Sequence, residues 1–211
     1  MSDELVFYTR PMSRGRLVRW MLEEIGCPYR TEIVDYGTTM KAPEYLAINP
    51  MGKVPALRHG ETVVTECAAI CCYLADMFPD AGLAPPPGDP LRGTYYRWLF
   101  FGAGPVEAAG TNKALGVEVP EDRRGMVGYG SLEDVMSTLE ASVSDRTYLV
   151  GDRFTTADVY IGSHIAWGMM TDTLEKRPAF ERYVGPLMAR PAAIRAREID
   201  DALMPESPAS G

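Results

Sequence analysis

The sequence predicts a two-part protein: an α/β domain with the element order β-α-β-α-β-β-α, followed by an all-helical C-terminal bundle. Three observations predict this fold class. Short β-forming runs alternate with helical periodicity up to about residue 78. The proline-rich segment 79–90 fits neither a helix nor a central strand, and the periodic segments beyond it all have helical spacing. We therefore divide the chain into an α/β domain at 1–78, a linker at 79–90 and a helical domain at 91–211.

The first half is predicted to begin with a strand at Leu5–Thr9, a loop, and a helix at Ser13–Ile25 that Gly26 ends. The other elements expected there are strands at Tyr29–Val34, Val54–Leu57 and Thr62–Val64, a short helical stretch at Pro43–Ile48, and a helix at Glu66–Met77. Residues 58–60 form a turn, so the last two strands are expected to pair antiparallel.

The second half is predicted to be helical at Leu91–Ala109, Asp122–Val143, Thr156–Met170, Pro178–Ala189 and Pro191–Leu203. Gly102, Gly104 and Pro105 lie within the first of these helices, which predicts a kink there. The last seven residues, 205–211, are expected to be a loose tail.

Composition excludes several classes of function. The chain has 46% hydrophobic residues and a formal net charge of −8, so we expect neither a nucleic acid nor an anionic membrane as a partner. Its first ten residues lack the pattern of a signal peptide, and we expect a cytoplasmic protein. The four cysteines contain no C-x-x-C pair, and there are only two histidines, so neither a metal site nor a disulfide framework is expected.

The loop YTRPMSRGR joins the first strand to the first helix, a position where α/β proteins bind ligands. Its hydroxyl-bearing candidates are Tyr8, Thr9 and Ser13. Taken alone, Ser13 is better explained as a helix N-cap. A helix N-terminus with nearby arginines would nevertheless stabilise an anion or a thiolate, and the arginines are Arg14, Arg16 and Arg19.

A second constellation is NPMGKVPAL, residues 49–57, in which Pro55 sits at the head of a strand. A cis Val54–Pro55 bond would turn the Val54 N–H and C=O outward, toward a peptide-like ligand laid along the edge. An ordinary trans turn is the alternative.

A third constellation, TVVTECAAI at 62–70, places Glu66 and Cys67 at the start of a helix, where free N–H groups suit a carboxylate. Glu66 itself would suit a ligand ammonium, so a ligand with both an α-amino and an α-carboxylate group satisfies both features. The alternative for Glu66 is a residue that complements the helix dipole.

Together these three segments resemble the glutathione transferase family. NPMGKVPAL is similar to its N-P-x-G-x-V-P-x-L segment, and TECAAICCYLAD is similar to its E-S-x-A-I-x-x-Y-L segment with Cys67 in place of the serine. GDRFTTADVYIG resembles the family's G-x-x-x-T-x-A-D segment, in which Thr155 and Asp158 would form a capping box. The resemblance spans residues 5 to about 200 and implies a thioredoxin-like N-terminal domain with a cis proline at Pro55.

The resemblance also implies roles for single residues. PMSRGRLVRW is similar to the serine-type P-x-S-R-x-x-R-x-x-W stretch, although the spacing of its arginines is one residue short. Ser13 would therefore hydrogen-bond the glutathione sulfur, with Thr9 ranked second and Tyr8 third. The glutathione-binding set is Ser13, Lys53, Val54, Pro55, Glu66 and Cys67.

The implied function is a glutathione transferase that activates the glutathione thiolate for attack on a hydrophobic electrophile, without a metal, and as a homodimer. The electrophile would lie between the domains, against Leu91–Ala109. One alternative is a glutathione-dependent peroxidase or disulfide reductase that uses Cys67, and another is a transferase-like binding module without catalysis. The sequence names neither the electrophile nor the subclass.

Overall fold

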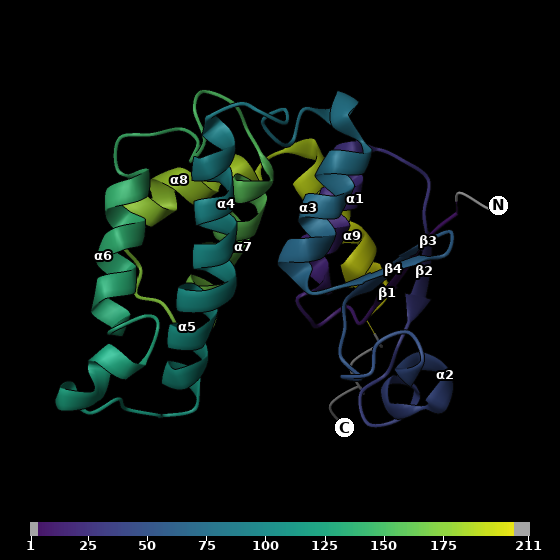
Figure 1. Ribbon diagram of the computed structural model, residues 1–211, viewed down its shortest axis with the longest axis horizontal. Helices are drawn as coiled ribbons and strands as arrows, with labels where there is room; N and C mark the ends of the chain where they lie inside the picture. The colour runs from purple at the N-terminus through teal and green to yellow at the C-terminus, as the bar shows by residue number, and fades with distance from the viewer. Residues whose placement is uncertain (1–3, 205–211) are drawn as a thin grey trace, which may run out of the picture. The chain divides into compact units, whose positions relative to one another are not determined.

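The computed structural model describes residues 4–204 and confirms an α/β part followed by helices (Figure 1). The tail expected at 205–211 lies outside the described residues. The described residues form two compact units, one of residues 4–74 together with 191–204, and one of residues 75–190. This grouping differs from the expected helical domain at 91–211, because the last helix packs on the sheet-bearing unit.

The sheet has four strands in the order β2-β1-β3-β4, namely β1 at Leu5–Thr9, β2 at Arg30–Ile33, β3 at Ala56–His59 and β4 at Thr62–Thr65. β1 pairs parallel to β2 and antiparallel to β3, and β3 pairs antiparallel to β4. The antiparallel pairing expected for the last two strands is confirmed.

Four α-helices accompany the sheet in the described residues of this unit: α1 at Gly15–Ile25, α2 at Pro43–Leu46, α3 beginning at Cys67, and α9 at Pro191–Ala202. A short 3₁₀ turn at Thr39–Lys41 precedes α2. Successive side chains of a strand point to opposite faces. Val6 and Tyr8 accordingly join the core beside α2, while Phe7 lies under the Arg19 guanidinium of α1.

The last helix, α9, packs against α1, and Figure 1 shows the two helices side by side. Asp200 on α9 accepts a hydrogen bond from Arg19 Nε at 2.7 Å, and both side chains are buried. Arg19 also donates to Tyr29 and Thr31 at 3.1 Å each, so the ion pair reaches the sheet as well.

The second unit is helical, with α4 at Leu91–Phe101, α5 at Glu107–Ala114, α6 at Leu132–Val143, α7 at Thr156–Met170 and α8 at Pro178–Met188. A π turn at Gly102–Val106 joins α4 to α5, at the position where the sequence predicts a kink. Helix α3, Cys67–Met77, runs from the first unit into this one, and a 3₁₀ turn follows it at Pro79–Ala81. No helix among residues 4–204 is long and apolar enough to cross a membrane.

The single helix expected at Asp122–Val143 is wrong. A 3₁₀ turn occupies Glu121–Met126, and α6 begins only at Leu132. Gly130 adopts a positive φ of 67° just before Ser131, whose side chain caps α6 together with Asp134. The glycine-rich segment before Ser131 therefore interrupts the helix, because glycine readily adopts the positive φ that other residues avoid.

The capping box expected in GDRFTTADVYIG is confirmed at the start of α7. The Thr155 N–H and hydroxyl donate to Asp158 at 2.8 and 3.1 Å. The same carboxylate accepts hydrogen bonds from the Leu149 N–H and the Tyr183 hydroxyl, both at 2.8 Å, so it ties three segments of the helical unit together.

Candidate functional site

The register of the sheet brings the three segments singled out from the sequence to one end. Tyr8, Ala56 and Thr65 lie opposite one another in a row across β1, β3 and β4. Just beyond this row come the loop that follows β1, the Val54–Pro55 bond that precedes β3, and the start of α3 that follows β4. The fold therefore gathers all three segments at the same edge of the sheet.

The three candidate hydroxyls differ in their exposure. Tyr8 is 8% exposed and its ring lies 5.8 Å from that of Tyr45, within the core beside α2. Thr9 is fully buried on the opposite face, so close to Gly15 that a Cβ at Gly15 would clash with the Thr9 hydroxyl. Ser13 is half-buried. Among these three residues, Ser13 alone is not buried.

The Ser13 hydroxyl makes two local hydrogen bonds. It donates to the Arg10 carbonyl at 2.6 Å and accepts from the Gly15 N–H at 3.0 Å. Thr9 directs its hydroxyl to the same Arg10 carbonyl at 3.4 Å. The residue before α1 is Arg14, which makes no side-chain cap, so Ser13 supports the first turn from one position earlier. Ser13 thus supports the start of α1, as the N-cap alternative expects, but it does not occupy the N-cap position itself.

The other carbonyls of this loop are also held. Arg16 Nε donates to the Pro11 carbonyl at 2.7 Å, and the Tyr36 hydroxyl donates to the Met12 carbonyl at 3.2 Å. In contrast, no hydrogen bond within residues 4–204 uses the N–H of Met12 or Ser13. The loop is therefore fixed through its oxygen atoms, while these two donors are available to an anion.

The start of α3 lies against the same loop. The Cys67 thiol approaches the Arg14 carbonyl at 3.8 Å. The preceding residue, Glu66, has a positive φ of 68°, which is uncommon for a residue other than glycine. Its side chain is exposed, and in the part of the chain that the structure describes it makes no ion pair or hydrogen bond. The carboxylate can therefore meet a ligand cation.

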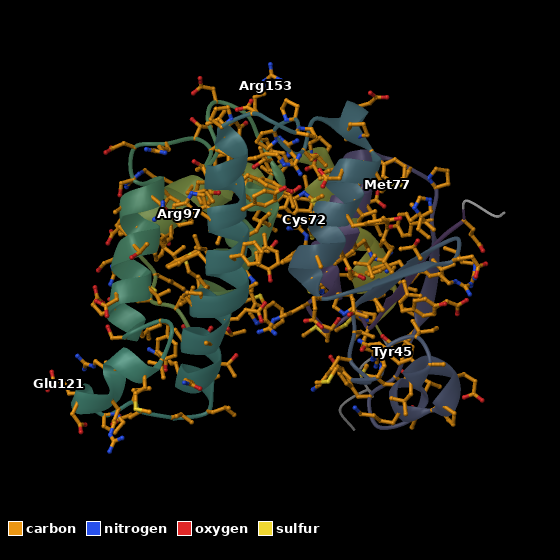
Figure 2. All side chains as sticks on the ribbon, viewed as in Figure 1. Tyr45, Cys72, Met77, Arg97, Glu121 and Arg153 are labelled. Atoms are coloured by element: carbon orange, nitrogen blue, oxygen red, sulfur yellow. The ribbon has the colours of Figure 1, made fainter. Side chains whose placement is uncertain are left out.

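The segment before β3 is anchored on one side and open on the other. Tyr45 on α2 (Figure 2) and Asn49 both donate to the Lys53 carbonyl, at 2.6 and 2.8 Å, and burial raises the pKa of Tyr45 to about 12. The Val54–Pro55 bond is cis, as predicted. Among residues 4–204, no partner takes the Val54 N–H or C=O, and the Lys53 side chain is exposed.

Comparison with known proteins agrees with this arrangement. Residues 12–77 match the family model for the glutathione S-transferase N-terminal domain, and residues 130–191 match the one for the C-terminal domain. The glutathione S-transferase GstA of Escherichia coli O157:H7 is 30% identical over 165 residues, which cover 77% of this chain and 78% of that protein. The chain belongs to the glutathione S-transferase family.

Solved glutathione S-transferases share the fold over nearly the whole chain. A glutathione transferase from Methylococcus capsulatus is 29% identical, with a TM-score of 0.79 over 94% of this chain and 99% of that one. A sphingomonad glutathione S-transferase, solved in complex with glutathione, is 25% identical, with a TM-score of 0.77 over 93% of this chain and 98% of that one. The N-terminal part is accordingly thioredoxin-like.

In this glutathione S-transferase, the structure adds contacts around the candidate site that no sequence pattern indicates. Asn49 lies inside the recognised NPMGKVPAL segment, yet its role in holding the Lys53 carbonyl is visible only in the structure. The Tyr36 contact joins residues far apart in the sequence, and the Arg16–Pro11 contact depends on the conformation of the loop, so neither has a local sequence signal. Within residues 4–204, no group of three potential ligands could hold a metal ion, and no cysteine forms a disulfide.

Proposed function

We propose that this glutathione transferase binds glutathione at the sheet edge beyond Tyr8, Ala56 and Thr65, with the sulfur at Ser13. The observation that carries this proposal is the hydroxyl of half-buried Ser13, in a loop whose carbonyls are fixed and whose Met12 and Ser13 N–H groups are available. Thr9 and Tyr8 are the lesser candidates for the same role, because both residues are buried, one on each face of the sheet.

Activation of the thiol requires a lower pKa. A free thiol with a pKa near 8.5 is only a few per cent thiolate at neutral pH, and a shift of about two units corresponds to about 2.7 kcal/mol. A hydrogen bond to the sulfur, two backbone N–H groups and the start of α1 can together supply that amount. The Ser13 hydroxyl would turn from the Arg10 carbonyl to the sulfur, while the Gly15 N–H keeps its oxygen in place.

The γ-glutamyl end of glutathione carries an ammonium and a carboxylate, and we propose that the start of α3 binds both. Exposed Glu66 pairs with the ammonium, and the carboxylate lies at Cys67 and the N–H groups of the first turn. Because a thiol is a weaker donor than the serine hydroxyl that the family pattern expects, the backbone N–H groups carry more of the interaction.

The middle of glutathione is a peptide, and the open Val54 N–H and C=O suit its cysteinyl backbone. The exposed Lys53 ammonium suits the terminal glycine carboxylate. Pro55 fixes the approach of this segment to β3. These assignments together account for each polar end of the tripeptide with a residue of this unit.

The bound thiolate then attacks an electrophilic carbon, forming a carbon–sulfur bond as the leaving group departs with the bonding electrons. We propose a small hydrophobic electrophile and assign its binding to the helical unit. Retention on immobilised glutathione, followed by assays with a panel of electrophiles and hydroperoxides, tests this function. Binding without turnover of any of them would contradict it and would favour a binding module instead.

We further propose a homodimer in the cytoplasm. Phe100 on α4 is 74% exposed and Tyr96 on the same helix is 41% exposed, and large apolar side chains exposed together favour an interface. Four cysteines without a disulfide suit a reducing compartment.

A further inference from the structure

The segment 10–14 between β1 and α1, which we call the Ser13 loop, is connected to the C-terminal helix α9 by the side chain of Arg16. Arg16 donates from Nε to the Pro11 carbonyl at 2.7 Å and from Nη2 to Asp201 Oδ1 on α9 at 2.6 Å. The guanidinium is planar, so fixing Nη2 also fixes the direction of the Nε–H bond. Asp201 therefore helps to aim the donor that holds the Pro11 carbonyl.

The Pro11 carbonyl lies two residues before Ser13, in the middle of the loop. The carbonyls on either side of it are held from within the same unit, Arg10 by the Ser13 hydroxyl and Met12 by the Tyr36 hydroxyl. When glutathione draws the Ser13 hydroxyl toward its sulfur, the Arg10 carbonyl loses that donor. The contacts from Arg16 and Tyr36 then keep the loop in place.

We propose that Arg16, oriented by Asp201, is a positioning residue that holds the Ser13 loop for thiolate formation and thereby makes α9 part of the glutathione site. This inference rests on the proposed role of Ser13. It goes beyond that role because it assigns a function in the glutathione half-reaction to the C-terminal helix, which the sequence alone places with the helical domain.

A second ion pair between α1 and α9 supplies a matched control. Arg195 on α9 donates to Glu23 on α1 at 3.2 Å from Nε to Oε2, and at 3.1 Å from Nη2 to the Glu23 carbonyl. This pair has the same residue type and joins the same two helices, but Glu23 lies near the far end of α1 from Ser13. Loss of helix docking alone would affect both pairs in the same way.

The experiment uses Arg16→Lys, Arg195→Lys, Asp201→Asn and Ser13→Ala in the full chain. Thiolate absorbance of bound glutathione is titrated against pH, and kcat and KM for glutathione are measured with one electrophile. Lysine keeps the positive charge, but its single ammonium cannot reproduce the fork that holds both partners of Arg16.

We expect Arg16→Lys to raise the pKa of bound glutathione by about half a unit and to lower kcat about threefold, with KM for glutathione nearly unchanged. Arg195→Lys should change neither quantity. Asp201→Asn should also raise this pKa, although removal of a negative charge would by itself lower it. The direction of that shift separates positioning from a simple field effect.

Equal shifts in Arg16→Lys and Arg195→Lys, no shift in Arg16→Lys, or a downward shift in Asp201→Asn would overturn the inference. Ser13→Ala separates this outcome from failure of the proposed function. A shift in Ser13→Ala without one in Arg16→Lys overturns only the role of Arg16, whereas no shift in Ser13→Ala overturns the role of Ser13 on which it rests.

Discussion

Arg19 and Asp200 form an ion pair with 2.7 Å between Nε and Oδ1, and each side chain is only 1% exposed. Burial raises the pKa of Asp200 from its ordinary value, while the Arg19 charge opposes that shift. Within residues 4–204, Arg19 Nη2 and Asp200 Oδ2 have no hydrogen-bond partner, so the pair is enclosed but not fully satisfied. Such a pair fixes where α9 docks, because neither charge is tolerated there alone.

Removing one member of this pair should be costly. We expect Arg19→Met to lower the free energy of unfolding by about 3–5 kcal/mol, because it leaves the Asp200 carboxylate buried without its partner. The double variant Arg19→Met, Asp200→Leu should recover a large part of that loss. Urea unfolding of the two single variants and the double variant gives the coupling, and strictly additive losses would show that the two side chains act independently.

Asp158 should produce a pH dependence of stability. Burial raises its pKa above the ordinary value of 3.8, although four hydrogen bonds oppose the shift. The native state therefore binds this proton more tightly than the unfolded state, so the contribution of Asp158 to stability falls as pH rises toward its native pKa. We expect the free energy of unfolding, relative to Asp158→Asn, to decrease as the pH rises above the ordinary Asp pKa of about 4. A relative increase as the pH rises would mean that the native pKa of Asp158 is lowered.

Glu66 is expected to matter for binding rather than for folding. Glu66→Gln should weaken glutathione binding about tenfold, since it removes the charge that pairs with the ammonium, and should leave the unfolding midpoint nearly unchanged. Glu61→Gln is the matched control, because Glu61 is an exposed glutamate in the turn between β3 and β4. Equal calorimetric affinities for the two variants would remove Glu66 from the site.

The oligomeric state can be measured directly. A homodimer should have twice the 23.2 kDa mass of one chain in light scattering at micromolar concentration. Phe100→Glu should shift this mass toward the monomer, because it places a charge at an exposed aromatic position proposed to lie in an interface. A single-chain mass for the unaltered protein would rule out the dimer.

Much of the fold and site could be predicted because the signals are local. The NPMGKVPAL segment and the Thr155–Asp158 box carry their geometry in consecutive residues, and the structure confirms the cis bond and the capping box. The docking of α9 could not be predicted in this way, since Asp200 in a charged helix looks like a surface residue until Arg19 is known to face it. The late start of α6 does not follow from the sequence pattern, because the helical periodicity of this segment outweighs the glycines before Ser131.

Whether Ser13 activates the thiol is decided by the thiolate absorbance of bound glutathione, titrated against pH in the unaltered protein, Ser13→Ala and Thr9→Ala. We expect Ser13→Ala to raise the thiol pKa by about one unit with nearly unchanged glutathione affinity, and Thr9→Ala to leave that pKa in place. If Ser13 only supports the first turn of α1, Ser13→Ala should lower the free energy of unfolding by about 1 kcal/mol and leave the thiol pKa unchanged. An unchanged thiol pKa in Ser13→Ala would contradict activation by Ser13, and a shift in Thr9→Ala alone would assign the role to Thr9.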